Sequence, residues 1–137
     1  KKMKKSRLLN SELSYEIAKI GHTAHITLCD AGLPIPQNVK RIDLAIEAGL
    51  PGFINVLDPV LSEMQVEEII LAEEIKEKNM PMYEAIMKSF KEAGMNPKVV
   101  FVPHEEFKKI THNSEAIVRT GECSPYANVI LKSGVVF

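Results

Sequence analysis

Two pairs of polar side chains in this sequence have the types and spacing needed to move protons and to bind hydroxyl groups. His22 and Asp30 lie near the two ends of the stretch GHTAHITLCDAG. Tyr126 and Asn128 are two residues apart in GECSPYANVI, where the chain is predicted to be extended, so both side chains should face the same way. A histidine gives and takes protons near neutral pH. Carboxylate, phenol and amide groups together offer both donors and acceptors. These residue types suit acid–base chemistry on a small molecule rich in hydroxyl groups.

A third pair lies in the stretch PHEEFKK, where His104 and Lys108 are four residues apart. The stretch is predicted to be a short helix, on which residues four apart share one face. These two side chains could therefore bind hydroxyl groups together. The alternative is an exposed basic face of the helix without a ligand.

The elements around Asp30 favour a place at a ligand-binding edge. Ile26 to Cys29 is a short apolar run and is predicted to be a strand, and Asp30 follows it in a loop rich in glycine and proline. In open α/β sheets, ligands gather beyond the carboxyl ends of strands. The same aspartate could instead order its own loop by accepting backbone N–H groups.

His22 also has a second interpretation, because it follows the predicted end of a helix at Gly21. A histidine there can interact with the last helical carbonyl groups. His22 and His25 form an H-x-x-H pair, but no carboxylate or cysteine completes a known metal-ligand pattern. We therefore predict no metal site.

The hydrophobic pattern predicts an α/β fold, with a central sheet of short strands and helices packed against it. Ser11 is the expected N-cap of the first helix. The predicted helices comprise residues 12–20, 53–64 (with Pro59 ending or kinking it), 82–93 and 104–110. The predicted strands comprise residues 26–29, 42–46, 66–75, 99–102, 116–119 and a C-terminal strand or hairpin from Asn128. Residues 66–75 could also form a helix, but their Ile-Ile-Leu core favours a strand.

Composition excludes several classes of protein. The 137 residues are 45% apolar and 26% charged, with a net charge of -1, which is ordinary for one globular domain. Neither nucleic acid nor an anionic membrane is an expected partner. The first eight residues are expected to be a basic, partly flexible tail. The chain has two cysteines, of which Cys29 lies in an apolar run, and this usage favours the cytoplasm.

Short motifs along the chain resemble the ribose pyranase and fucose mutarotase family. In order they are LNSEL, GHT, CDAGLPIP, RIDLAI, EMQVE, AEEIK, HEEFK, RTGECSPYANVIL and GVVF. The resemblance extends from about residue 9 to residue 137. The stretches DAGLPIP and SPYAN are similar to the ribose branch rather than to the fucose branch.

The resemblance implies an enzyme without cofactor or metal that interconverts the pyranose and furanose forms of D-ribose and supplies the furanose for phosphorylation. It implies that His22 is the acid–base residue. It implies sugar contacts from Asp30, His104, Lys108 and the segment Tyr126–Ala127–Asn128. It also implies a ring-shaped homo-oligomer, a pentameric ring or a decamer, with sites between neighbouring subunits.

The distance between His22 and Asp30 agrees with a site between subunits. Eight extended residues span ~26 Å, more than one ribose molecule covers. Either the chain folds back before the strand, or His22 and Asp30 belong to different pockets that a neighbouring subunit completes. We expect the second arrangement, a composite pocket to which two chains contribute. Two alternatives remain: a ribose-binding accessory protein of sugar uptake that catalyses nothing, and a mutarotase for another sugar such as L-fucose.

Overall fold

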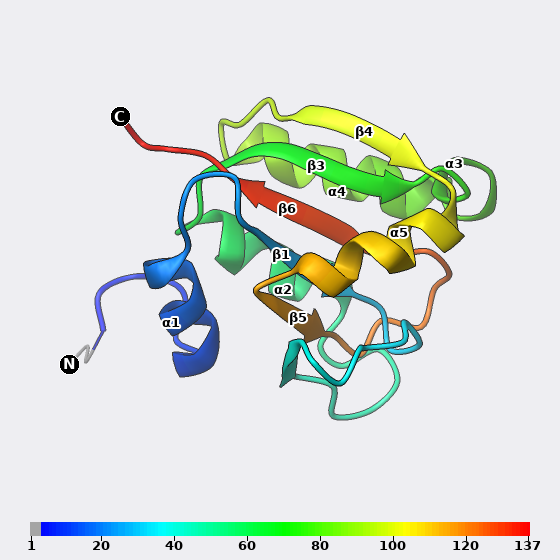
Figure 1. The fold of residues 1–137 in the computed structure, drawn as a ribbon, viewed down its shortest axis with the longest axis horizontal. Coiled ribbons are helices and arrows are strands. Elements are labelled where there is room, and N and C mark those ends of the chain that lie inside the picture. The colour runs from blue at the N-terminus through cyan, green and yellow to red at the C-terminus, as the bar shows by residue number, and fades with distance from the viewer. Residues whose placement is uncertain (1–3) are drawn as a thin grey trace.

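The computed structural model describes residues 4–137, and it confirms the α/β class (Figure 1). A six-stranded sheet is the centre of the fold. The elements in chain order are α1 (Ser11–Lys19), β1 (His25–Cys29), β2 (Lys40–Asp43), α2 (Phe53–Leu61), β3 (Val66–Ala72), α3 (Ile75–Lys78), α4 (Met80–Glu92), β4 (Lys98–Val102), α5 (His104–Ile110), a 3₁₀ turn (Thr111–Asn113), β5 (Ala116–Arg119) and β6 (Val129–Ser133).

The direction of the strands decides which loops meet. The strand order is β2-β5-β1-β6-β3-β4, and β6 is antiparallel to both of its neighbours. The other neighbouring strands pair in parallel. The carboxyl ends of β1 to β5 therefore lie along one edge of the sheet, together with the residues that precede β6. We call this edge the carboxyl edge and the other one the amino edge.

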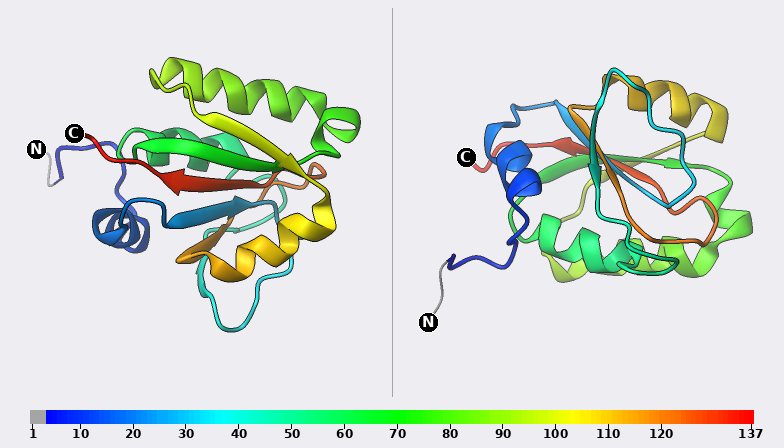
Figure 2. Two further views of the ribbon diagram at one scale, coloured as in Figure 1. Left: turned by 45° about the horizontal axis from the view of Figure 1, so that its top comes forward. Right: turned by 90° about the horizontal axis from the view of Figure 1, so that it is seen from below.

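Both faces of the sheet are covered, as Figure 2 shows. Helices α2 and α4 pack on one face, where Leu28, Leu71 and Leu131 belong to the larger hydrophobic core. Helix α5 and the loop after β1 pack on the other face, where Phe107 and Ile117 belong to a smaller core. Successive strand residues alternate between the two cores, as the two-residue period of a strand requires.

The first helix begins one residue earlier than predicted. Asn10, not Ser11, is the N-cap, because its side chain accepts a hydrogen bond of 2.9 Å from the amide of Leu13. The helix ends at Lys19, and the extended conformation of Ile20 terminates it before Gly21.

Two predicted strands are too long at their carboxyl ends. The strand expected over residues 42–46 ends at Asp43, because the Asp43 carboxylate accepts the amide of Ala45 and turns the chain. As a result Ile46 is 78% exposed. The strand expected over residues 66–75 ends at Ala72, and its last predicted residue, Ile75, begins α3.

The remaining elements agree with the predictions within a few residues. The second helix ends at Leu61 and contains Pro59. The helix at residues 104–110 and the strand at residues 116–119 have the predicted bounds. Of the predicted N-terminal tail, residues 1–3 lie outside the described residues, whereas Leu8 is buried in the larger core. In residues 4–137, none of the helices has the length and apolarity that a membrane crossing requires.

Candidate functional site

A small pocket at the carboxyl edge contains most of the predicted ligand-binding residues. Its volume is about 250 Å³, and its lining residues are Asp30, Gly32, Leu33, His104, Pro125, Tyr126 and Asn128. Drug-sized ligands occupy pockets of roughly 300–1,000 Å³, so this pocket suits a smaller molecule. Asp30 follows β1, His104 follows β4, and the Tyr126–Asn128 segment precedes β6. The fold therefore brings together residues that are up to 98 positions apart.

Direct contacts hold the pocket residues in place. The Asn128 side-chain oxygen accepts the amide of Asp30 at 2.9 Å, and the Asp30 carboxylate accepts the amide of Gly32 at 3.0 Å. The rings of His104 and Tyr126 meet edge to face, with centroids 5.0 Å apart. Asp30 thus orders its own loop, as one interpretation predicted, and it also lines the pocket.

The segment before β6 is a turn and not the predicted extended chain. Tyr126 has φ 58, and the Asn128 amide donates to the Tyr126 carbonyl at 2.9 Å. Both side chains nevertheless line the pocket. A left-handed residue is uncommon outside glycine and often marks a functional site.

Two buried polar atoms of the pocket residues have no hydrogen-bond partner within the described part of the chain. They are the side-chain nitrogens His104 Nδ1 and Asn128 Nδ2. Most buried polar groups in proteins are paired, because an unpaired one costs free energy. Both side chains line the pocket, so a polar ligand bound there is a candidate partner for these atoms.

The surroundings of Asp30 favour the neutral form of its carboxyl group more than water does. Burial raises the pKa of the Asp30 carboxyl, although the backbone N–H groups of Gly32 and Leu33 and the nearby His104 oppose this shift. A raised pKa of this kind is frequent at functional sites, and it makes Asp30 a candidate for contact with a ligand.

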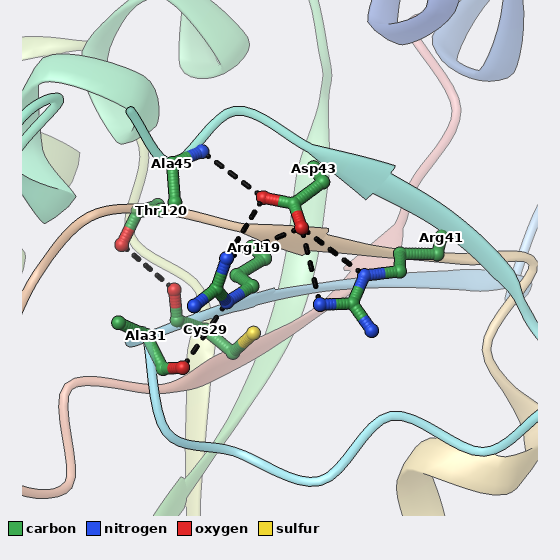
Figure 3. A network of polar contacts seen from close by, with 7 residues as sticks. All are labelled: Cys29, Ala31, Arg41, Asp43, Ala45, Arg119 and Thr120. Atoms are coloured by element: carbon green, nitrogen blue, oxygen red, sulfur yellow. Dashed lines mark hydrogen bonds and ion pairs between the residues drawn. The ribbon is translucent and has the colours of Figure 1, made fainter. Parts of the chain in front are cut away.

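Figure 3 shows polar contacts that hold the backbone of Cys29 and Ala31. The Arg119 guanidinium donates to the Ala31 carbonyl at 3.1 Å and to the Asp43 carboxylate at 3.2 Å. Thr120 donates to the Cys29 carbonyl at 2.8 Å. Because Cys29 and Ala31 flank Asp30, these bonds position its backbone.

Sequence reasoning missed the residues that position the pocket. Glu74 accepts the amide of His104 at 3.0 Å and so fixes the start of α5, and Asn79 donates to the Pro125 carbonyl at 2.8 Å. Opposite charges on two predicted strands, Asp43 and Arg119, were a signal that could have revealed the network. Glu74 and Asn79 have no such signal, because only the tertiary fold brings them near their partners.

Two predicted ligand residues do not line the pocket. Lys108 forms an ion pair of 2.8 Å with Glu105 on its own helix. Ala127 is fully buried in the larger core, so it could reach a ligand only through backbone atoms.

His22 lies at the amino edge, at the opposite end of β1 from Asp30. Its Nε2 atom is 2.9 Å from the Glu67 carboxylate, so the ring does not bind the last carbonyl groups of α1. A five-residue strand is about 16 Å long, and β1 has five residues. The pocket at the carboxyl edge of one subunit is therefore out of reach of its own His22.

The other predicted reactive groups have structural surroundings. His25 Nδ1 is 3.1 Å from the Ser114 hydroxyl, and burial together with nearby Lys132 lowers the pKa of His25. Burial also raises the pKa of the Cys29 thiol to about 12, which fits its role as a small apolar residue. Within residues 4–137, no three metal-ligating side chains form a cluster.

Comparison with known proteins identifies the family. Residues 3–136 match the RbsD / FucU transport protein family. The chain belongs to this family. It is 67% identical over 135 residues to a D-ribose pyranase of Rhodopirellula baltica, which covers 98% of this chain and 100% of that relative. It is 56% identical over 139 residues to a D-ribose pyranase of Haemophilus influenzae, with the same coverage.

Two solved structures have similar folds. Bacillus subtilis RbsD complexed with D-ribose has a TM-score of 0.91 and 43% identity, and the match covers 98% of this chain and 100% of that chain. The fucose mutarotase of Streptococcus pneumoniae in complex with L-fucose has a TM-score of 0.79 and 26% identity, with 93% and 94% covered.

Proposed function

We propose that this chain is an isomerase that interconverts the pyranose and furanose forms of D-ribose. The observation that carries the proposal is the pocket itself, where His104 Nδ1 and Asn128 Nδ2 are buried and unpaired beside Asp30 in the described residues. Relatives with 67% and 56% identity are named D-ribose pyranase, and the most similar solved structure cited above holds D-ribose. The furanose product would supply a ribose-phosphorylating step.

The chemistry requires only proton transfer between oxygen atoms. The ring opens when the anomeric hydroxyl loses a proton and the ring oxygen gains one, and a different hydroxyl then closes on the carbonyl. Asp30 accepts hydrogen bonds from hydroxyl groups, whereas Tyr126 and Asn128 both donate and accept. Two effects accelerate the exchange: the site holds the open chain in one geometry, and its acid–base groups transfer the protons. No step requires a cofactor.

We assign the acid–base role to His22 of a neighbouring subunit. His22 and Asp30 lie at opposite ends of β1, so a pocket that uses both needs two chains. A ring of subunits, pentameric or doubled to a decamer, would bring the amino edge of one copy against the carboxyl edge of the next. Lys108 and the backbone of Ala127 remain lesser candidates for sugar contacts.

Exposed apolar side chains support this self-association. Leu9 is 72% exposed and Leu50 is 51% exposed, and Leu50 lines an apolar groove of about 390 Å³ with Leu44, Ile46 and Pro51. Apolar patches of this kind mark protein–protein contacts. Both cysteines are free, which fits a reducing compartment, and we place the protein in the cytoplasm.

A magnetisation-transfer NMR measurement tests the proposed activity. D-Ribose and, separately, L-fucose are mixed with the protein, and the exchange rates between their ring forms are compared with those without protein. We expect acceleration of pyranose–furanose exchange of ribose. Binding without acceleration would show an accessory protein of sugar uptake, as the transport family name suggests. Faster exchange of fucose than of ribose would show a fucose mutarotase.

A mixing experiment tests the composite site. His22→Ala and Asp30→Ala proteins are each inactive in the proposal, but a mixed assembly contains pockets in which one chain supplies His22 and the other Asp30. Activity should return when the two variants exchange subunits. If exchange is demonstrated by mass spectrometry and no activity returns, the two residues do not share a pocket.

A further inference from the structure

We propose that Glu67 is a positioning residue that holds the imidazole of His22 in one tautomer, with the proton on Nε2 and the lone pair on Nδ1. This inference rests on the proposed acid–base role of His22. Nothing in the sequence pattern pointed to Glu67, because 45 positions separate it from His22. The pairing is a product of the fold, in which the turn before β1 lies beside the start of β3.

The chemistry of the contact determines the tautomer. The Nε2 atom of His22 is 2.9 Å from Oε1 of Glu67. An ionised carboxylate only accepts hydrogen bonds, whereas a neutral imidazole has one donor and one acceptor nitrogen. The hydrogen bond therefore requires the proton on Nε2. Nδ1 is then the atom that takes up or returns a proton during ring opening.

The backbone around Glu67 is adapted to this contact. Val66 pairs with Ser133 and Glu68 pairs with Lys132, so β3 advances two residues where β6 advances one. Glu67 is the extra residue of this β-bulge. Bulges redirect side chains and are frequent beside active sites.

The residue opposite the bulge leaves room for Glu67. A Cβ atom at Gly134 would lie 3.1 Å from the Glu67 Cβ, closer than side chains normally pack. The Gly134 amide donates to the Gln65 carbonyl at 2.9 Å, which keeps the chain beside the bulge.

The turn that carries His22 is also unusual. Thr23 has φ 72, a left-handed conformation that β-branched residues rarely adopt. The Thr23 amide donates to the Ser133 carbonyl at 3.1 Å, and the Ser133 amide donates to the Ala24 carbonyl at 2.9 Å. The end of β6 thus holds the His22 turn on one side and the bulge on the other.

Stability does not explain this arrangement. The side chains of His22 and Glu67 are 49% and 44% exposed, and exposed ion pairs contribute little to the free energy of folding. A strained turn and a bulge that meet at an exposed pair are typical of a functional site. Contact with a neighbouring subunit would shield the pair from water and strengthen its effect on the imidazole.

The test is a ¹⁵N NMR measurement of the His22 tautomer at about pH 9, where an ordinary imidazole is neutral. The wild-type protein should show the Nε2–H form of His22. Glu67→Gln should reduce the fraction of this form, because an amide can both donate and accept. Glu67→Asp should retain more of it. Glu68→Gln is the matched control, since Glu68 is the next residue of the strand and pairs with Lys132 at 3.2 Å.

Ring-exchange kinetics on the same variants show whether the tautomer matters. Glu67→Gln should lower kcat roughly tenfold or more, part of the 10²–10⁴-fold that acid–base groups contribute, while KM for ribose changes less than about twofold. Glu68→Gln should leave both constants unchanged, and light scattering should show the same assembly for all variants.

The outcomes distinguish the inferred role of Glu67 from the proposed catalytic role of His22. If wild-type His22 carries its proton on Nδ1, or if Glu67→Gln leaves the tautomer ratio unchanged, the role of Glu67 is wrong whatever the activity. If the tautomer responds as expected but His22→Gln retains full ring exchange, the inferred contact stands and the proposed catalytic role of His22 fails.

Discussion

Asp30 connects the chemistry of the pocket to the stability of the protein. Burial raises the pKa of its carboxyl group in the folded state. Its contribution to stability is therefore fully present below the unfolded value of about 3.9, and it is lost as the pH rises through the folded-state pKa. Asp30→Asn has no ionisable group at this position, so it does not lose stability in this way as the pH rises. Relative to wild type, the variant should gain free energy of unfolding between about pH 4 and pH 7, measured by urea unfolding.

Asp43→Asn is the matched control, because its trend has the opposite sign. Burial alone would raise the pKa of Asp43, but hydrogen bonds from Ala45, Arg119 and Arg41 outweigh it and lower the pKa. Asp43 thus stabilises the protein above its unfolded pKa, and this contribution is lost as the pH falls through the folded value. Parallel pH trends in the two variants would contradict the described burial of Asp30.

The phenol of Tyr126 is expected to bind a sugar hydroxyl. Tyr126→Phe keeps the edge-to-face contact with His104 and removes only the hydroxyl group. A hydrogen bond contributes about 1 kcal/mol, so the dissociation constant for D-ribose should rise about fivefold, measured by isothermal titration calorimetry. Tyr83→Phe is the control, because Tyr83 packs against Phe101 outside the pocket. Equal affinities of the two variants would remove Tyr126 from the list of sugar contacts.

At the scale of elements, Gly121 joins the end of β5 to the loop before α2. A Cβ atom there would lie 2.6 Å from the Leu50 carbonyl oxygen and 2.7 Å from that of Glu47. Gly121→Ala must displace this loop, and we expect a loss of about 1–3 kcal/mol in the free energy of unfolding. Gly21→Ala is the control, because a Cβ at Gly21 would have no neighbour within 4 Å. A Gly121→Ala protein as stable as the control would contradict the described packing.

Some helices and strands were predictable from the sequence because their patterns are local. Strands such as β5 and β1 are short apolar runs buried on both faces, and α5 follows Pro103 with a clear helical pattern. The predictions were wrong at the ends of β2 and β3, where a local pattern continued but tertiary contacts turned the chain. The Asp43 side chain ends one of these strands by binding a backbone amide, a contact that hydrophobic periodicity does not register.

For the whole molecule, the composite site makes activity depend on assembly. Ile46 is 78% exposed and lines the apolar groove that we assign to self-association. Ile46→Glu would place an unpaired charge in that contact. Light scattering should then show smaller species, and ring exchange should fall at least about tenfold. Glu84→Lys, on the exposed face of α4, should keep both the assembly and the activity. A fully active Ile46→Glu monomer would disprove the need for a second chain.

The sequence by itself determined the α/β class, the family and the residue types of the pocket, because apolar periodicity and short motifs are local properties of the chain. Only the tertiary structure decided which of those residues meet. The antiparallel insertion of β6 between β1 and β3 brings Asn128 to Asp30 at one edge of the sheet and Ser133 to the His22 turn at the other. Strand order depends on contacts between distant segments, which one-dimensional spacing does not record.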